Sequence, residues 1–182
     1  MNAALLPPEL RSQWAERGIF PLREGERWAA AALLARAFAA DPLMRALLPP
    51  GENFEGRLRR FYDLTLRGLM RAGVCLAARD GERVRAFYAF LPPRRNVSLL
   101  DEVLGGQLGL VPLLGPRLLA GLEVQEAAAR QRERLAPGAW YVALVATDPA
   151  AQGQGSCGPR WSRCWPTPRR RAAASIWKRR TP

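Results

Sequence analysis

Apolar residues follow two different periods along the chain, and the changes of period predict the order of its elements. Spacing of three and four residues predicts amphipathic helices at 25–48 and 55–72, and again between 98 and 136. Short apolar runs rich in β-branched and aromatic residues predict strands at 19–24, 74–79, 83–91 and 140–146. The order strand, helix, helix, strand, strand, helices, strand indicates an α/β or α+β domain without internal repeats.

The two early helices each have a predicted apolar stripe and a predicted end. The first stripe consists of Trp28, Ala32, Leu33, Ala35, Ala37 and Phe38. Asp41-Pro42 interrupts this helix, and Pro49-Pro50-Gly51 stops it. The second stripe consists of Leu58, Phe61, Tyr62, Leu64, Thr65, Leu69 and Met70. Gly73 is a plausible C′ residue. The arginines outside the second stripe are read as a solvated face in preference to an anion-binding surface.

Turn residues predict how the strands connect. Asp80-Gly81 separates two apolar runs, which is a strong hairpin signal. Pro21 places the first strand at a sheet edge or at a strand start. Residues 1–18 read as a lead-in with one helical turn, and the long insert at 98–136 is where a binding wall or lid would lie.

The sequence WYVALVATDPAAQGQG, from Trp140 to Gly155, joins the last predicted strand to a glycine-rich turn. Backbone N–H groups at a turn that opens a helix bind anions such as phosphate, because they present several donors to one ligand. Glycine suits such a loop because a side chain would block close approach of the backbone.

The hairpin, the strand ending in VATDP and the loop AAQGQG together resemble the GNAT superfamily of acyl-CoA-dependent N-acyltransferases, over about residues 19–155. The family signature is Gln/Arg-x-x-Gly-x-Gly/Ala, and its first four places match residues 152–155. The resemblance implies a GNAT-like central sheet, mixed but mostly antiparallel, flanked by helices. Residues 1–155 would then form the N-terminal and central part of an acyltransferase domain.

The resemblance also implies a co-substrate and a site. The strand end would pair with the pantetheine arm of acetyl-CoA, and the loop would hold the pyrophosphate. The implied binding residues are Leu144, Val145, Ala146, Thr147, Gln152, Gly153, Gln154 and Gly155. An amine would attack the thioester directly in a ternary complex, so the protein would mainly position the reactants and remove a proton.

No catalytic acid or base is assigned. Asp148 precedes a proline in a turn, where a structural role is favoured over a role as base. Glu123 and Glu126 are read as solvated, and Cys75 as a core residue. The chain has no histidine, which excludes a Ser-His-Asp triad and a Cys/His zinc site. The acceptor amine and the oligomeric state are left open.

The family pattern breaks at Cys157, where the signature calls for Gly or Ala. Residues 156–182 hold 8 of the 28 Lys and Arg residues and none of the 16 Asp and Glu residues, so residues 1–155 carry a formal charge of only +4. A reading-frame shift soon after Gly155 explains this Arg/Pro/Trp-rich tail. Reading each codon one base earlier forces Leu at Cys164-Trp165, Ala at Trp165-Pro166 and Glu at Trp177-Lys178. The tail is therefore expected to be non-native and disordered, with the C-terminal part of the fold missing.

The function predicted from these patterns is an N-acetyltransferase that uses acetyl-CoA on a primary amine, with impaired or no activity in the chain as written. One alternative is a nucleic-acid-binding protein that uses the basic tail. Another is a non-catalytic acyl-CoA binder. The apolar runs are too short for a membrane span and the start does not resemble a signal peptide, so a cytoplasmic location is expected. The three irregularly spaced cysteines argue against a disulfide framework.

Overall fold

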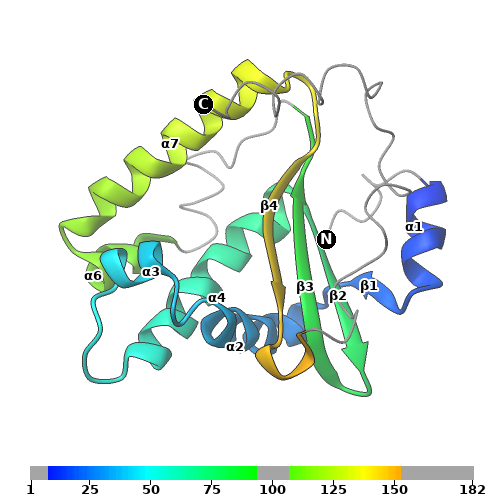
Figure 1. Ribbon diagram of the computed structural model, residues 1–182, viewed down its shortest axis with the longest axis horizontal. Helices are drawn as coiled ribbons and strands as arrows, with labels where there is room; N and C mark the ends of the chain where they lie inside the picture. Colours follow the sequence, from blue (N-terminus) through cyan, green and yellow to red (C-terminus); the bar gives the residue numbers. More distant parts are fainter. Residues whose placement is uncertain (1–7, 94–106, 153–182) are drawn as a thin grey trace, which may run out of the picture.

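Within the described part of the chain, the centre of the fold is a four-stranded antiparallel sheet in the order β1-β2-β3-β4 (Figure 1). The computed structural model describes residues 8–93 and 107–152, so the predicted tail lies outside the described residues. The strands are β1 (Ile19–Pro21), β2 (Val74–Asp80), β3 (Arg83–Leu91) and β4 (Tyr141–Thr147). Helices flank the sheet, as predicted, and β1 takes the edge position that Pro21 indicated.

The β2–β3 hairpin forms at the predicted turn. Gly81 has a φ of +58°, a left-handed conformation that glycine adopts without a steric penalty. Asp80 pairs with Arg83 and Arg79 with Val84, whereas Ala78 pairs with Ala86. Arg85 is therefore an extra residue on β3, which makes a bulge close to the turn.

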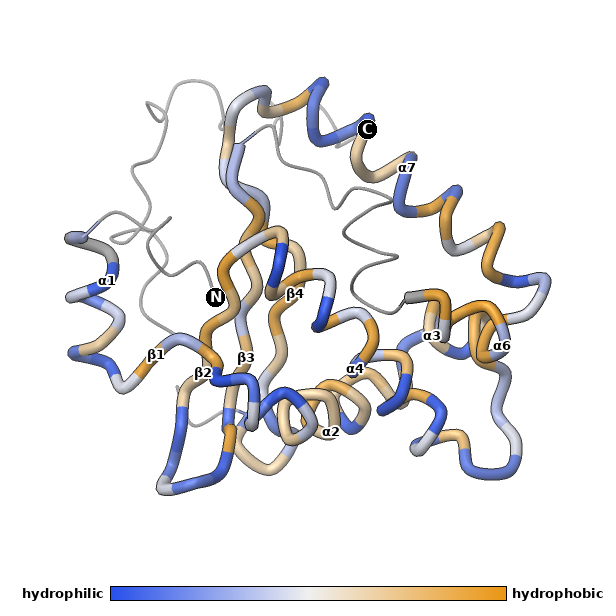
Figure 2. The backbone as a smooth tube through the Cα atoms, turned by 180° about the vertical axis from the view of Figure 1, so that it is seen from behind, coloured by the Kyte–Doolittle hydropathy of each residue, from blue (hydrophilic) through white to orange (hydrophobic). Residues whose placement is uncertain are grey.

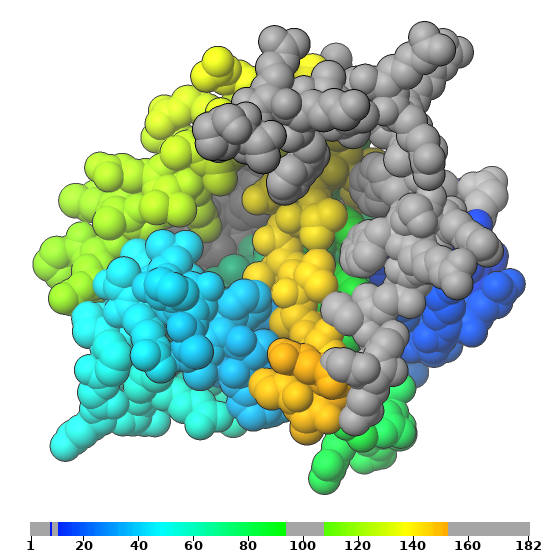
Figure 3. Space-filling view, viewed as in Figure 1, coloured from blue at the N-terminus to red at the C-terminus, as the bar shows by residue number. Residues whose placement is uncertain are grey.

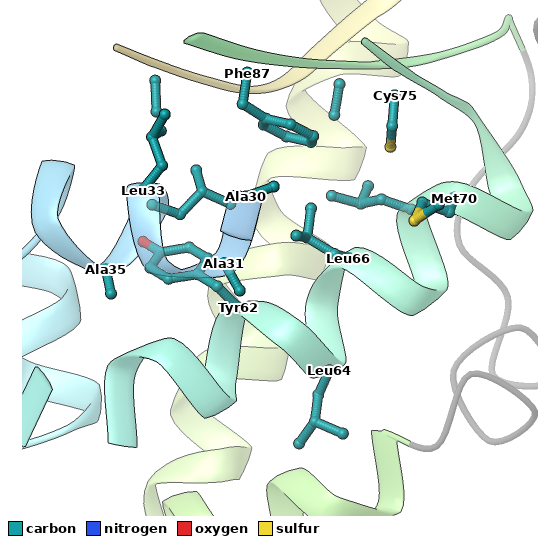
Figure 4. Packing of buried hydrophobic residues seen from close by; sticks show 14 of the residues in the cluster. Ala30, Ala31, Leu33, Ala35, Tyr62, Leu64, Leu66, Met70, Cys75 and Phe87 are labelled. Carbon is teal, nitrogen blue, oxygen red and sulfur yellow. The ribbon is translucent and has the colours of Figure 1, made fainter. Parts of the chain in front are cut away.

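One face of the sheet is covered by α2 (Arg27–Ala37) and α4 (Phe54–Ala72). Alternate strand residues point toward these helices, and Figure 4 shows Cys75 and Phe87 directed at the side chains of both. In Figure 2 the tube is mostly orange to tan where the strands pass the helices, and blue at the hairpin end of β2 and β3. The largest fully buried residues of this core are Phe87, Leu22, Leu33, Leu34, Leu48, Leu58, Leu64 and Leu66. Burial of this apolar surface is the main force that holds the helices on the sheet.

The opposite face carries a second, smaller apolar cluster that the sequence pattern did not predict. The lead-in forms a helix, α1 (Pro8–Ala15), rather than a single turn. Trp14 of α1 is buried against the rings of Tyr88 and Phe90 at centroid distances of 5.4 and 5.5 Å, both edge to face. Such aromatic pairs add stabilisation beyond their buried area. The N-terminal segment is thus part of the core.

The break at Asp41-Pro42 is confirmed, but the predicted stripe on α2 is partly wrong. Asp41 caps α3 (Pro42–Leu47) by accepting a hydrogen bond from the backbone N–H of Met44 at 3.0 Å. Trp28, placed in the stripe from its spacing, is 46% exposed. The guanidinium of Arg59 lies 3.9 Å from the Trp28 ring centroid, so a cation–π contact holds the ring on the surface.

The α2–α4 interface contains a charged residue that periodicity missed. Asp63 is almost fully buried, and its carboxylate accepts a hydrogen bond from Arg27 Nε at 2.8 Å and another from Arg67 Nη2 at 3.2 Å. The side chain of Arg60 lies 3.5 Å away. A buried carboxylate is tolerated where it is paired and hydrogen-bonded, and this one joins the two helices.

Gly73 follows α4 as predicted, but it does not adopt the left-handed conformation that is common at a C′ position. Its φ and ψ are −142° and −155°, which is extended backbone. A Cβ at this position would lie 2.2 Å from the carbonyl oxygen of Phe90. Glycine is required here because α4 runs into β2 directly against the backbone of β3.

The insert before β4 is helical, as predicted, over the part that is described. It comprises α6 (Leu110–Leu114) and α7 (Arg117–Leu135), preceded by a 3₁₀ turn at Gln107–Gly109. Leu110 and Leu114 are buried in the main core, whereas α7 contains no buried residue. The helical lead-in expected at 98–106 lies outside the described residues.

Candidate functional site

The predicted site lies on β4, which has a neighbouring strand on one side only among residues 8–93 and 107–152. Figure 3 shows β4 and the turn after it on the molecular surface. Ala89 pairs with Leu144 and Phe90 with Val142, so Ala143 is an extra residue on β4. This bulge lets both Ala143 and Leu144 pack against the main core. It also bends the strand next to the predicted site, where bulges are common in enzymes.

The hydrogen bonds of β4 decide which backbone groups are available to a ligand. The backbone N–H of Asp148 donates to the carbonyl of Arg85 at 2.8 Å. Backbone groups of an antiparallel strand face its neighbour at every second residue, so those of Ala146 and Leu144 also face β3. The N–H and C=O groups of Val145 and Thr147 therefore point to the open edge.

Two polar side chains stand at the end of this edge. The hydroxyl of Thr147 is buried and has no hydrogen-bond partner among the described residues. The amide of Gln152 donates to the Thr147 carbonyl at 3.4 Å, which draws the start of the predicted loop back onto the strand. Of the predicted binding residues, the structure describes Leu144, Val145, Ala146, Thr147 and Gln152. Gly153, Gln154 and Gly155 lie outside the described residues.

Asp148 has the structural role that its position before Pro149 indicated. One carboxylate oxygen accepts a hydrogen bond from Arg36 at 2.7 Å, and the other accepts one from the backbone N–H of Ala150 at 3.1 Å. The hydrogen bond from Arg36 is the main cause that lowers the pKa of the Asp148 carboxyl. A carboxylate with a lowered pKa and two donors is a weak proton acceptor at neutral pH. It fixes the 3₁₀ turn Pro149–Ala151, which leads into the loop.

Arg36 is the residue near the site that sequence reasoning missed. It lies at the end of α2, 112 positions before Asp148, and it ties the helix layer to the turn after β4. A single arginine in an alanine-rich helix carries no local signal for such a contact. The only related signal is the favourable position of a basic residue in the last turn of a helix.

The other chemical candidates are not near the site or are not reactive. Burial raises the pKa of the Cys75 thiol to about 12, so it is a core residue as predicted and not a nucleophile. Glu123 and Glu126 are exposed on α7, as predicted, and Glu126 pairs with Arg130 at 2.7 Å. In the part of the chain that is described, no group of acidic, Cys or His side chains could hold a metal ion. No helix there has the length and apolar character of a membrane span.

The long insert reaches β4 at the start of the strand. The guanidinium of Arg132 on α7 lies 4.8 Å from the ring centroid of Tyr141. The surface is hollowed between α7 and β4 in Figure 3. The insert thus contacts the first residue of β4, and its role as a binding wall stays a prediction.

Comparison with known proteins identifies the fold. No protein-family model and no curated protein matches the chain. Among solved structures, the chain matches the crystal structure described as histone acetyltransferase HPA2 and related acetyltransferase from Corynebacterium glutamicum ATCC 13032, with a TM-score of 0.54 and 20% sequence identity. The match covers 76% of this chain and 64% of that chain. The protein thus has the GNAT acetyltransferase fold, and it spans less than two thirds of the length of that structure.

Proposed function

We propose that this chain derives from an N-acetyltransferase that transfers the acetyl group of acetyl-CoA to a primary amine. The observation that carries the proposal is the edge of β4 that is open among the described residues, which presents the backbone of Val145 and Thr147 and precedes the glycine-rich sequence at 152–155. The GNAT acetyltransferase fold supports the same reading. Fold alone does not specify activity, so the proposal rests on the combination of edge, turn and fold.

The pantetheine arm of acetyl-CoA would lie along the open edge of β4. Its amide groups would exchange hydrogen bonds with the N–H and C=O groups of Val145 and Thr147, as an added strand does. The pyrophosphate would be held by backbone N–H groups of residues 152–155. Leu144 and Ala146 would contribute packing, because their backbone groups are already bonded to β3.

The reaction would be a direct transfer. The amine nitrogen attacks the thioester carbonyl, the C–S bond breaks, CoA leaves as the thiolate, and the ammonium proton passes to solvent or to a base. We assign no residue to this proton. Asp148 is unsuited to it, because Arg36 and the Ala150 N–H occupy its two oxygens.

The chain as written is proposed to be impaired. The residues that follow Gly155 do not continue the GNAT pattern, and a reading-frame shift explains their composition. Sequencing the coding DNA across codons 150–182 tests this directly. A sequence that confirms the tail, together with turnover of acetyl-CoA by the purified full chain, would refute the claim of impairment.

Binding and turnover are measured separately on the full chain and on a version with the frame restored after codon 155. Calorimetric titration with acetyl-CoA reports binding, and thiol release in the presence of a panel of amines reports transfer. The informative variant is Val145→Pro, which removes an outward-facing N–H that proline at an edge strand can spare. We expect it to fold and to lose acetyl-CoA affinity. The matched variant Ala146→Pro removes a bond to β3 and is expected to lower stability instead.

Each alternative function predicts a different result. If the frame-restored chain binds acetyl-CoA but releases no thiol with any amine in the panel, it is a non-catalytic acyl-CoA binder. Salt-dependent nucleic-acid binding that disappears when residues 156–182 are deleted would favour the basic tail as the functional element. Absence of acetyl-CoA binding by both chains would refute the proposal.

A further inference from the structure

The start of β3 places an arginine beside the turn that follows β4. Arg85 is the extra residue of the bulge in β3, and its carbonyl accepts the hydrogen bond from the backbone N–H of Asp148 at 2.8 Å. Figure 1 shows the hairpin end of β2 and β3 and the turn after β4 at the same end of the sheet. Asp148 is four positions before Gln152, where the predicted phosphate loop begins. The bulge therefore holds Arg85 next to the approach to that loop.

The side chain of Arg85 has unused hydrogen-bonding capacity. A guanidinium carries five N–H donors. Within the described part of the chain, the Arg85 side chain makes one hydrogen bond, from Nη2 to Asp80 Oδ2 at 2.6 Å, and its buried Nε has no partner. The Asp80 side chain is 66% exposed, so this ion pair stabilises the fold little. A buried N–H without a partner destabilises the fold, and a ligand that accepts from it would offset that cost.

The neighbouring charges leave Arg85 available to an anion. The Asp148 carboxylate would repel a phosphate, but Arg36 donates to it at 2.7 Å and the Ala150 N–H donates to it at 3.1 Å. The pKa of Asp148 is lowered mainly by the hydrogen bond from Arg36 and also by the charge of Arg85, so the Arg85 guanidinium lies close to this carboxylate. Arg36 is thus committed to the turn, whereas Arg85 is held near it only by an exposed partner.

We propose that Arg85 binds a phosphate group at the nucleotide end of acetyl-CoA. This rests on the proposed function, and it extends that site beyond the backbone groups of β4 and of residues 152–155. The forked donors of an arginine match two oxygens of a phosphate, and each of these hydrogen bonds is charge-assisted. Arg85 then favours free acyl-CoA, whose nucleotide carries a pyrophosphate and a 3′-phosphate, over an acylated pantetheine that lacks the nucleotide.

Calorimetric titration of the full chain and of the frame-restored chain tests this contact with two probes. One probe is acetyl-CoA, and the other is ADP with an added 3′-phosphate, which is the nucleotide part of CoA. Arg85→Gln is expected to weaken the binding of both probes about tenfold, because a charge-assisted hydrogen bond is lost. The control Arg83→Gln removes an equal charge from an exposed arginine at the hairpin end of the same strand, and is expected to change neither affinity by more than about twofold.

Asp80→Asn separates ligand binding from a structural role of the same ion pair. Asparagine has the shape of aspartate and is equally suited to turns, so the hairpin is expected to persist, and circular dichroism of both variants is expected to match the parent chain. The change removes a negative charge that competes for Arg85. We therefore expect both probes to bind about two- to threefold more tightly. If the ion pair only braces the hairpin, Asp80→Asn and Arg85→Gln weaken binding alike, which overturns the proposal.

The two probes also separate failure of the Arg85 contact from failure of the proposed function. Acetyl-CoA affinity that Arg85→Gln leaves unchanged, or that Arg83→Gln lowers equally, overturns the contact and leaves the proposed function intact. Nucleotide binding that depends on Arg85, in chains that do not bind acetyl-CoA, supports the contact and refutes the proposed function. If neither chain binds either probe, both proposals are wrong.

Discussion

Replacement of Gly73 is the most direct test of how the helix layer joins the sheet. The residue ends α4 and begins the turn into β2, where the chain passes the backbone of β3. A Cβ there would lie 2.2 Å from the carbonyl oxygen of Phe90 and 3.2 Å from its carbonyl carbon. An unstrained carbon–oxygen contact is about 3.3 Å or longer, so the strand or the helix end would have to move by roughly 1 Å. The atom in the way belongs to a paired strand and cannot rotate aside.

The expected cost of Gly73→Ala follows from that contact. Overpacking a core costs typically about 1–3 kcal/mol, and a fixed backbone atom places this substitution at the upper end, about 3 kcal/mol. Where a glycine has an ordinary conformation and free space, the change to alanine stabilises by about 0.4–1 kcal/mol through the unfolded chain. Gly51 is such a site, because a Cβ added there would meet nothing within 4 Å, and Gly51→Ala is the matched control.

Urea denaturation followed by circular dichroism measures both free energies of unfolding. Gly73→Asn distinguishes a steric requirement for glycine from a requirement for left-handed backbone, because asparagine is well tolerated at a left-handed C′ position. If the residue were left-handed, Asn would be the milder replacement. The close approach to Phe90 makes Asn at least as destabilising as Ala. A free energy of unfolding for Gly73→Ala within about 0.5 kcal/mol of the parent chain would refute the steric argument.

Two further predictions concern ion pairs. Glu26 accepts hydrogen bonds from Arg79 Nε and Nη2, both at 2.6 Å, which lowers the pKa of the Glu26 carboxyl. Glu26→Gln is expected to lower the free energy of unfolding by about 1.5–3 kcal/mol at pH 7. Because folding lowers the pKa of Glu26, this stabilisation is present above the unfolded pKa of about 4.3 and is lost as the pH falls below it. The difference in free energy of unfolding between the parent chain and Glu26→Gln should therefore shrink when unfolding is measured at decreasing pH. A difference that does not change with pH would contradict the ion pair between Glu26 and Arg79 as its cause. Arg36→Gln removes the contact to Asp148 and is expected to lower the free energy of unfolding by only about 0.5–1 kcal/mol, since Arg36 is half exposed. In the frame-restored chain we expect the same change to weaken acetyl-CoA binding, measured by calorimetry. Unchanged affinity would show that the turn after β4 does not need Arg36.

Much of the fold was predictable because its signals are local. The hairpin at Asp80-Gly81 depends on a turn that glycine alone enters freely, and the break at Asp41-Pro42 depends on a cap and on proline chemistry. The strand before the VATDP turn was likewise predicted to within one residue at each end. In each of these cases the residues that decide the structure are within a few positions of one another.

The errors arose where the deciding partner is distant in the chain. Trp28 has the right spacing for the core of α2, yet Arg59 on α4 holds it on the surface. Asp63 is a charged residue that is buried between α2 and α4 rather than exposed, because Arg27 of α2 lies across the interface and pairs with it. Gly73 has the sequence position of a C′ residue, but the carbonyl of Phe90 determines why it is glycine.

In the candidate site, too, some features follow from neighbouring residues and others from contacts between distant parts of the chain. The sequence by itself determined that a strand ends in a turn followed by glycines, because strand periodicity and turn chemistry are properties of neighbouring residues. Only the tertiary structure decided that β4 is an edge strand among the described residues, and that Val145 and Thr147 rather than Leu144 and Ala146 present their backbone at that edge. It also decided that Arg36 holds Asp148. Those facts depend on which strand pairs with β4 and in which register. Pairing is settled by packing of the whole chain and not by the local pattern.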